Sequence, residues 1–278
     1  MTDLNERSKL YSKDILLSIA KGKHCPLADR FNSELNHRSL LDLYDCTINH
    51  LGLYYRNDLY FRHLITQKIF LSNYVSGASY LLSEVRAGNS IVDLVVLNES
   101  STVYEIKSDV DNLKRLSDQL SDYLLVFDQV YVVFGEKHIK KVINLDDRVG
   151  IYTVNNQNDL IMLKPARSNK RNVNPRVIFK TLRKPEYLSI IHSHYGKLPS
   201  VPNTKIYAEC NKLFNLLSPE DAHEMFVEQL KKRAKNQSYL VESLAKIPNS
   251  IVYPVLIYNF SKSITEQLVK NISCNRGL

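Results

Sequence analysis

The sequence predicts an α/β protein in which a mixed β-sheet is flanked by helices, with a helical N-terminal extension and a mainly helical C-terminal region. Short apolar and β-branched segments, bounded by turn residues, predict the strands. Segments whose apolar residues recur every three or four positions predict the helices. From about residue 60 the predicted order is α-β-β-β-α-β-α-β. Helices that follow strands in this way are expected to cover both faces of the sheet.

The N-terminal extension is predicted to be helical over residues 8–72. Amphipathic runs begin at Leu10, Leu40 and Leu59, and interior Gly and Pro residues are few. Asn57 precedes the third run and can cap its first turn. These runs predict a layer of helices before the first strand.

Three strands are predicted next, at 80–86, 91–97 and 102–107. The turns between them are short, so we expect neighbouring antiparallel strands. A helix capped by Ser108 or Asp109 should follow, with an apolar stripe as far as Phe127. The remaining predicted elements of the sheet region are a strand at 129–134, a short helix at 137–143 and a strand at 151–154.

Charge divides the chain unevenly. Residues 1–163 hold 18 basic and 21 acidic residues, a net charge of −3, whereas residues 164–278 hold 19 and 8, a net charge of +11. We therefore predict three regions: a sheet domain with its helical extension (1–163), a basic linker or exposed arm (164–184), and a basic, mainly helical region (185–278). An excess of this size favours a polyanionic partner, most simply nucleic acid, over a merely solubilising surface.

Several classes of protein find no support in the sequence. The four cysteines form no CxxC pair, which favours free thiols in a reducing compartment. No signal peptide is visible, and no apolar run approaches the ~18 residues of a membrane span. A cytoplasmic protein with no membrane association is expected. A glycine-rich phosphate loop is also missing, so ATP binding is unsupported.

Two acidic residues and a lysine form the candidate site. Side chains alternate along a strand, so Glu105 and Lys107 should share one face of their strand. Asp93 lies on the preceding strand and can come beside Glu105 if the two strands pair. Two neighbouring carboxylates repel each other, and Mg²⁺ or Mn²⁺ would remove that cost. The alternative is a plain ion pair between Glu105 and Lys107 on a half-exposed sheet.

This pattern resembles the PD-(D/E)xK nuclease superfamily: Asp93, eleven further residues, then Glu105-Ile106-Lys107. Val92 stands where the motif often has Pro. The resemblance covers about residues 75–155 and implies a restriction-endonuclease-like fold. Within the superfamily, the sequence around the motif looks like a poorly characterised bacterial and prophage family. The resemblance also implies that Asp93, Glu105 and the Ile106 carbonyl bind the metal, and that Lys107 positions the attacking water. In-line attack on phosphorus would leave a 5′-phosphate and a 3′-hydroxyl.

Four further residues are candidates for the same site. Gln119 and Tyr123 match the QxxxY helix of the RecB-type branch, whose side chains support the site and the DNA backbone; the alternative is a boundary Gln and a core Tyr. Arg115, one turn earlier, can contact phosphate or remain solvated. The superfamily often has an upstream Glu that completes the metal site, and the resemblance therefore implies Glu84, the only acidic residue between Asp58 and Asp93, as a further catalytic and metal-binding carboxylate. Its alternative is an exposed residue paired with Arg86.

The sequence thus predicts a metal-dependent nuclease that hydrolyses phosphodiester bonds in nucleic acid, with DNA as the expected substrate. Two alternatives remain open at this point. One is a non-catalytic nucleic-acid-binding or adaptor protein on a nuclease fold, and the other is an RNA-cutting toxin or phage-defence effector. The region 185–278 can provide contacts to a protein partner or to a second copy of the chain.

Overall fold

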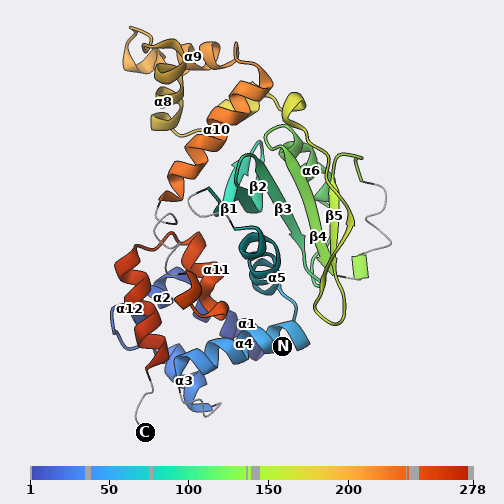
Figure 1. Cartoon of the computed structure of the whole chain (residues 1–278), viewed down its shortest axis with the longest axis vertical. Helices are drawn as coiled ribbons and strands as arrows, with labels where there is room; N and C mark the ends of the chain where they lie inside the picture. Colours follow the sequence, from blue (N-terminus) through green and yellow to red (C-terminus); the bar gives the residue numbers. More distant parts are fainter. Residues whose placement is uncertain are drawn as a thin grey trace.

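A six-stranded sheet with helices on both faces forms the centre of the molecule (Figure 1). This arrangement confirms the predicted α/β class, the helical N-terminal region and the mainly helical C-terminal region. The computed structural model describes residues 2–34, 39–74, 78–135, 137–138, 145–235, 237 and 244–274.

The strands follow one another across the sheet in chain order. Neighbours pair antiparallel from β1 to β3, parallel from β3 to β5, and antiparallel again between β5 and β6. The strands are β1 (Tyr80–Ala87), β2 (Ser90–Leu97), β3 (Ser101–Lys107), β4 (Gln129–Gly135), β5 (Gly150–Val154) and β6 (Leu160–Lys164). The first five match the predicted strands. Strand β6 escaped prediction because apolar and polar residues do not alternate along it, and Ile161, Met162 and Leu163 are exposed.

One face of the sheet is covered by helices from both ends of the chain. Apolar side chains on this face include Leu94, Tyr104, Ile106 and Val133, and they share one core with the covering helices. Helix α12 packs against α2 and α4, and α11 packs against α4 and α5. The covering helices are α1 (Thr2–Ser8), α2 (Lys13–Ala20), α3 (Pro26–Glu34), α4 (Leu40–Tyr54), α5 (Asp58–Ile65), α11 (Asn249–Ile257) and α12 (Lys262–Ser273).

A second core covers the opposite face, where Val92, Val103 and Val132 point. Its helices are α6 (Leu116–Leu124), α7 (Pro175–Thr181), α8 (Lys184–Tyr195), α9 (Asn203–Phe214) and α10 (Pro219–Arg233). Helix α6 is shorter than predicted because residues 108–115 form a loop. The Asp111 carboxylate accepts hydrogen bonds from the Ser108 N–H and hydroxyl there. Most of the predicted helix at 137–143 lies outside the described residues.

Residues 164–184, predicted to be a linker or exposed arm, are packed onto this second core. Ile178 and Phe179 of α7 are fully buried. The Asn169 amide donates to the carbonyls of Leu124 and Phe127, and the Asn174 N–H donates to the Leu125 carbonyl. Most of the basic side chains stay exposed, whereas the apolar side chains between them anchor the segment. The linker was predicted from the many basic residues, and the apolar residues of α7 between them were not recognised as the buried face of a helix.

The β1 edge of the sheet is closed by a side chain. Gln237 is 2% exposed, and its amide pairs with Leu81 as a neighbouring strand would. Its Oε1 accepts from the Leu81 N–H at 2.8 Å, and its Nε2 donates to the Leu81 carbonyl at 2.6 Å and to the Leu256 carbonyl at 3.0 Å. Buried backbone groups need such partners, so this amide joins the strand edge to α11.

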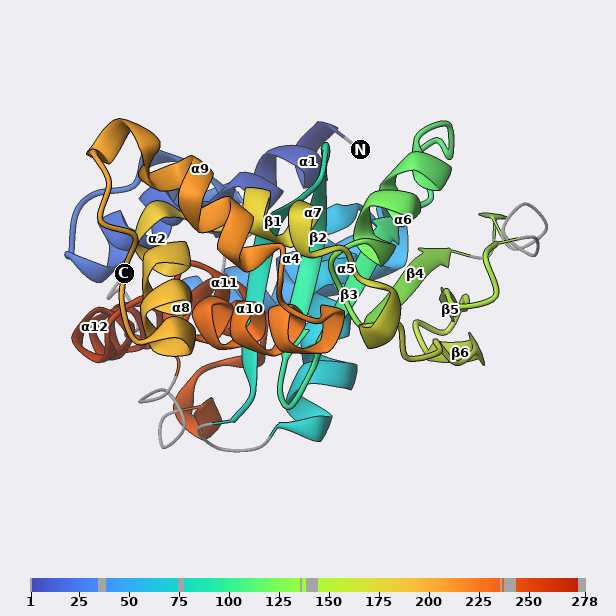
Figure 2. The ribbon, with the colours of Figure 1, turned by 90° about the horizontal axis from the view of Figure 1, so that it is seen from above.

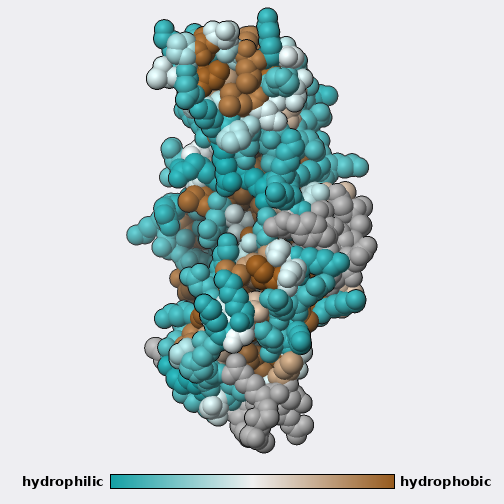
Figure 3. All heavy atoms as spheres, turned by 90° about the vertical axis from the view of Figure 1, so that its left-hand side faces the viewer, coloured by the Kyte–Doolittle hydropathy of each residue, from teal (hydrophilic) through white to brown (hydrophobic). Residues whose placement is uncertain are grey.

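Helices α8 and α9 project at one end of the molecule, and α10 runs from them towards α11 and α12 (Figure 1). Seen from above, α8 and α9 lie towards the β1 side, while β5 and β6 form the opposite edge (Figure 2). Apolar surface appears at the α8–α9 end (Figure 3). No helix among the described residues is long and apolar enough to cross a membrane.

A buried histidine ties α10 to the start of β3. His223 is fully buried, and its Nε2 lies 2.7 Å from the Ser101 hydroxyl. That hydroxyl also accepts a hydrogen bond from the Asp128 N–H at 3.2 Å. Burial lowers the pKa of His223 to about 4.

Acidification should therefore destabilise the protein through His223. The unfolded state takes up a proton near pH 6.5 and the folded state only near pH 4, so stability present above pH 6.5 is lost as the pH falls towards 4. We expect a loss of about 3 kcal/mol. Urea unfolding of the wild type and of His223→Gln at pH 7 and pH 4 measures it, because other titrating groups cancel in the difference. An equal loss in both proteins would contradict the prediction.

Candidate active site

Strand β2 leaves strand β3 at Asp93. Their registered pairs run from Leu97↔Ser101 to Leu94↔Tyr104 and end there. Beyond that point the Ile106 N–H donates to Asp93 Oδ2 at 2.8 Å, so a carboxylate stands where a backbone carbonyl would otherwise accept. Val92 and Leu94 belong to cores on opposite faces, which shows that side-chain alternation breaks at Asp93.

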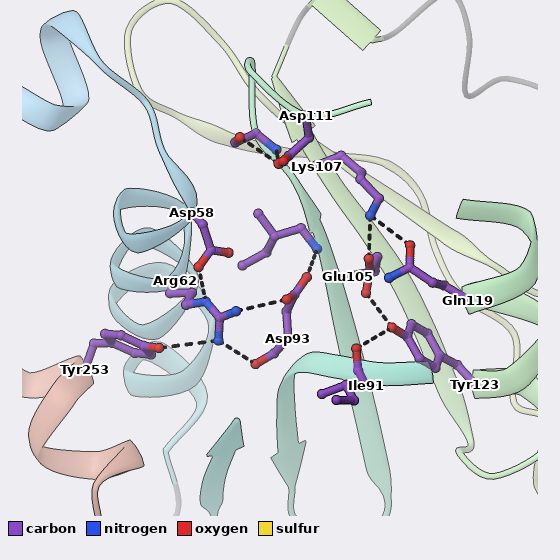
Figure 4. A network of polar contacts seen from close by, with 12 residues as sticks. Asp58, Arg62, Ile91, Asp93, Glu105, Lys107, Asp111, Gln119, Tyr123 and Tyr253 are labelled. Atoms are coloured by element: carbon purple, nitrogen blue, oxygen red, sulfur yellow. Dashed lines mark hydrogen bonds and ion pairs between the residues drawn. The ribbon is translucent and has the colours of Figure 1, made fainter. Parts of the chain in front are cut away.

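The second oxygen of Asp93 is paired with Arg62 of α5 (Figure 4). Arg62 Nη2 donates to Asp93 Oδ1 at 2.9 Å, and Nη1 donates to the Asp93 carbonyl at 2.9 Å. The same guanidinium donates to Asp58 Oδ2 at 2.6 Å and lies 3.5 Å from the Tyr253 hydroxyl of α11. Helices from both ends of the chain therefore hold one cation against Asp93.

Glu105 and Lys107 share a face of β3, as predicted, and that face looks towards α6. Lys107 Nζ donates to Glu105 Oε1 at 2.6 Å and to Gln119 Oε1 at 2.9 Å. The Tyr123 hydroxyl lies 2.7 Å from Glu105 Oε2 and 2.8 Å from the Ile91 carbonyl. It has one proton and can donate to only one of them at a time. Gln119 and Tyr123, four residues apart, thus fix the amine and the carboxylate from one helix face.

Burial dominates the electrostatics of the site. Glu105 is 1% exposed, and the side chains of Lys107 and Asp93 are 11% and 23% exposed. Burial, followed by the nearby charge of Glu105, raises the pKa of Asp93 to about 7, although Arg62 and the Ile106 N–H oppose the rise. Burial and Glu105 also raise the pKa of Tyr123 well above its usual range. Glu105 is therefore close enough to Asp93 for its charge to disfavour ionisation of Asp93.

Two of the predicted residues lie outside this cluster. Glu84 is exposed, and its left-handed φ of +56° turns it out of regular strand geometry. The pairs Ser83↔Leu94 and Val85↔Val92 set it across from Asp93, but its side chain lines a groove beside Arg62. Arg115 is exposed just before α6, and no described site residue hydrogen-bonds or ion-pairs with its side chain.

Sequence reasoning missed Asp58, Arg62 and Tyr253. The four-residue spacing of Asp58 and Arg62 was visible and predicts a local ion pair on a helix. Nothing local connects either residue to Asp93 or to Tyr253, which lies 191 positions after Arg62. These contacts depend on how α5 and α11 pack on the sheet.

The possible metal donors are few. Among the residues that the structure describes, no three His, Cys, Asp or Glu side chains converge as a ligand cluster. Asp93 and Glu105 supply two carboxylates. The Ile106 carbonyl faces the same side as its N–H, towards Asp93, because a strand residue directs both groups to one neighbour. Two carboxylates with a carbonyl suit Mg²⁺, which usually keeps several waters.

Breaking the Lys107–Glu105 pair should be costly because Glu105 would be left charged and buried. We expect Lys107→Met to lower the free energy of unfolding by about 3 kcal/mol. The double variant Lys107→Met/Glu105→Gln should recover more than half of this loss, since it removes the uncompensated charge. Chemical denaturation measures both, with the exposed Lys114→Met as control. A single variant as stable as that control would show that the pair contributes nothing.

Comparison with known proteins gives one family. No curated protein matches the chain. A solved structure described as "SPO1766 protein of unknown function from Silicibacter pomeroyi" is 14% identical, with a TM-score of 0.29, over 45% of this chain and 86% of that chain. The family model described as "Bacteriophage P4 protein cII" matches residues 59–252, a range that includes every predicted site residue. Because this match spans well over half of the chain, the protein belongs to the bacteriophage P4 protein cII family.

Proposed function

We propose that this phage-family protein is a metal-dependent nuclease that hydrolyses phosphodiester bonds in nucleic acid, with DNA as the expected substrate. One observation carries the proposal: Lys107 joins Glu105 to Gln119, Tyr123 reaches the same Glu105, and Asp93, bonded to the Ile106 N–H, lies near enough for the charge of Glu105 to raise its pKa. The five side chains come from three separate segments. A chance acid-acid-lysine pattern would give no reason for Gln119 and Tyr123 to meet it.

Asp93, Glu105 and the Ile106 carbonyl would hold Mg²⁺ or Mn²⁺. The residues fit such an ion because two mutually repelling, buried carboxylates are stabilised by a divalent charge. When bound, the ion would supply Lewis-acid stabilisation of charge on the phosphate. Glu84, exposed and turned from the strand, is a weaker candidate ligand than the sequence implied.

Lys107 is the residue that we expect to act on the reacting atoms. Its ammonium has three donor hydrogens, and two of them are used by Glu105 and Gln119. The third can donate to the attacking water or to a phosphate oxygen, and the buried setting strengthens that interaction. Gln119 and Tyr123 are positioning residues that keep Lys107 and Glu105 in place.

The charge of the C-terminal region supports a nucleic-acid substrate. Residues 164–278 carry a net charge of +11. Arg176 and Lys180 on α7 are exposed and four residues apart, so they lie on one helix face. Cations in this arrangement bind phosphates without reading sequence.

A second function, nucleic-acid binding without cleavage, has its own supporting observation. Arg62 already neutralises Asp93, and Glu105 is almost fully buried. A site in which every carboxylate oxygen has a protein donor can be stable without a metal. RNA cleavage remains a third possibility because the same residues can act on either sugar.

Asp93→Asn should reduce cleavage by about 100-fold or more, since it removes a metal-binding charge. The assay incubates the protein with Mg²⁺ or Mn²⁺ and linear duplex, plasmid, single-stranded DNA or RNA. A chelator should have the same effect, whereas Asp118→Asn on the exposed side of α6 should have none. Cleavage that survives both Asp93→Asn and chelation would defeat the nuclease. Tight binding with no cleavage of any substrate would favour the binding protein.

Binding to duplex DNA should weaken as salt rises. The double variant Arg176→Gln/Lys180→Gln should bind less tightly and lower the slope of log affinity against log salt by about 2, because each phosphate contact contributes nearly one. Fluorescence anisotropy across a salt series gives the slope. Lys262→Gln/Lys270→Gln on α12 removes the same charge elsewhere and should leave the slope unchanged. Equal slopes for both double variants would exclude α7 from the interface.

A further inference from the structure

Arg62 stands where it must compete with a divalent cation. Its guanidinium contacts both the Oδ1 atom and the carbonyl of Asp93 at 2.9 Å (Figure 4). An arginine cannot lose its charge in a protein, so this cation stays charged at any working pH. A metal that binds Asp93 would meet a fixed positive charge at the same carboxylate, and the two cannot be held there equally well.

A groove beside Arg62 is a second position that the guanidinium could occupy away from Asp93. The groove has a volume of about 480 Å³ and lies between α5, β1 and α11. Arg62 and Asp58 line one wall, and Glu84 lines another. No hydrogen bond or ion pair to the Glu84 carboxylate is found among the described residues, and its φ of +56° directs this part of β1 out of regular pairing. A carboxylate able to receive a cation therefore faces the same groove.

We propose that Arg62 is a displaceable counter-ion, which holds Asp93 while the metal is absent and moves into the groove towards Glu84 when a divalent cation binds Asp93 and Glu105. The inference rests on the proposed metal site. It gives Glu84 a role that differs from metal ligation. Arg62 and Glu84 are positioning residues here, since neither contacts the substrate in this scheme.

Charge balance supports the exchange. The Arg62 side chain is 12% exposed, and a buried cation that loses its carboxylate is strongly destabilised. Asp58 lies on the same helix with its side chain 51% exposed, so it can follow Arg62 into the groove. Glu84 then replaces the carboxylate that Arg62 gives up. Without Glu84, the released cation would keep one acidic partner in place of two.

The test is Mn²⁺ binding by the full chain, measured by calorimetry and by the paramagnetic resonance signal of free Mn²⁺. Arg62→Gln should bind Mn²⁺ about tenfold more tightly than the wild type, because the competing charge is gone, and Glu84→Gln should bind it about threefold more weakly. The exposed residues Arg86 and Glu99 provide controls of matched charge, Arg86→Gln and Glu99→Gln, which should both bind as the wild type does. Arg62→Gln/Asp93→Asn should lose the gain in affinity.

Arg62→Lys is a second variant, for the case in which Arg62→Gln fails to fold. It keeps the positive charge but loses the forked donors of the guanidinium. It should therefore bind Mn²⁺ with an affinity between those of the wild type and Arg62→Gln. Equal or weaker Mn²⁺ binding by Arg62→Gln overturns the counter-ion. If that binding is still lost in Asp93→Asn, the proposed metal site survives the failure. Absence of Mn²⁺ binding in every variant overturns both proposals.

Discussion

The site depends on a single hydrogen bond, from the Ile106 N–H to the Asp93 carboxylate. A sheet normally satisfies such an N–H with the carbonyl of the neighbouring strand. Here β2 has left β3, and a side chain completes the ladder instead. Because a buried backbone donor without a partner costs about 1–3 kcal/mol, this bond fixes Asp93 at the point where the strands separate. The separation brings the carboxylate within reach of both faces of the sheet.

Each carboxylate oxygen of the two acids lies within hydrogen-bond distance of a donor group, although Tyr123 shares its one proton between Glu105 and the Ile91 carbonyl. Asp93 receives Arg62 and the Ile106 N–H, while Glu105 has Lys107 and the Tyr123 hydroxyl. The two acids and two bases nearly cancel, which explains how so much charge is tolerated at low exposure. Such a cluster is stable in the state described. Any cation that enters it has to replace an existing partner and does not fill a vacant position.

The sequence was informative where the position of a side chain depends on the periodicity of its own strand or helix. Alternation placed Glu105 and Lys107 on one face, and helical spacing placed Gln119 and Tyr123 on another element facing them. The sequence was uninformative where the position of a residue depends on how separate elements pack together. Strand β6 lacks alternation, the basic segment 164–184 concealed a buried helix face, and Arg62 meets Asp93 only because α5 lies across the sheet. The contacts among Glu105, Lys107, Gln119 and Tyr123 were thus more predictable than the arginine that pairs with Asp93.

The C-terminal half contributes to the site through its packing. Tyr253 of α11 contacts Arg62, and the groove beside Arg62 is completed by Ile257 and Tyr258. Gln237 links the same helix to the edge of β1, the strand that carries Glu84. The position of Arg62 is therefore set jointly by α5 and α11, which lie 191 residues apart where they meet. Helices at the two ends of the chain share one core, so a change in the packing of α11 would alter the charge that faces Asp93 without touching either acid.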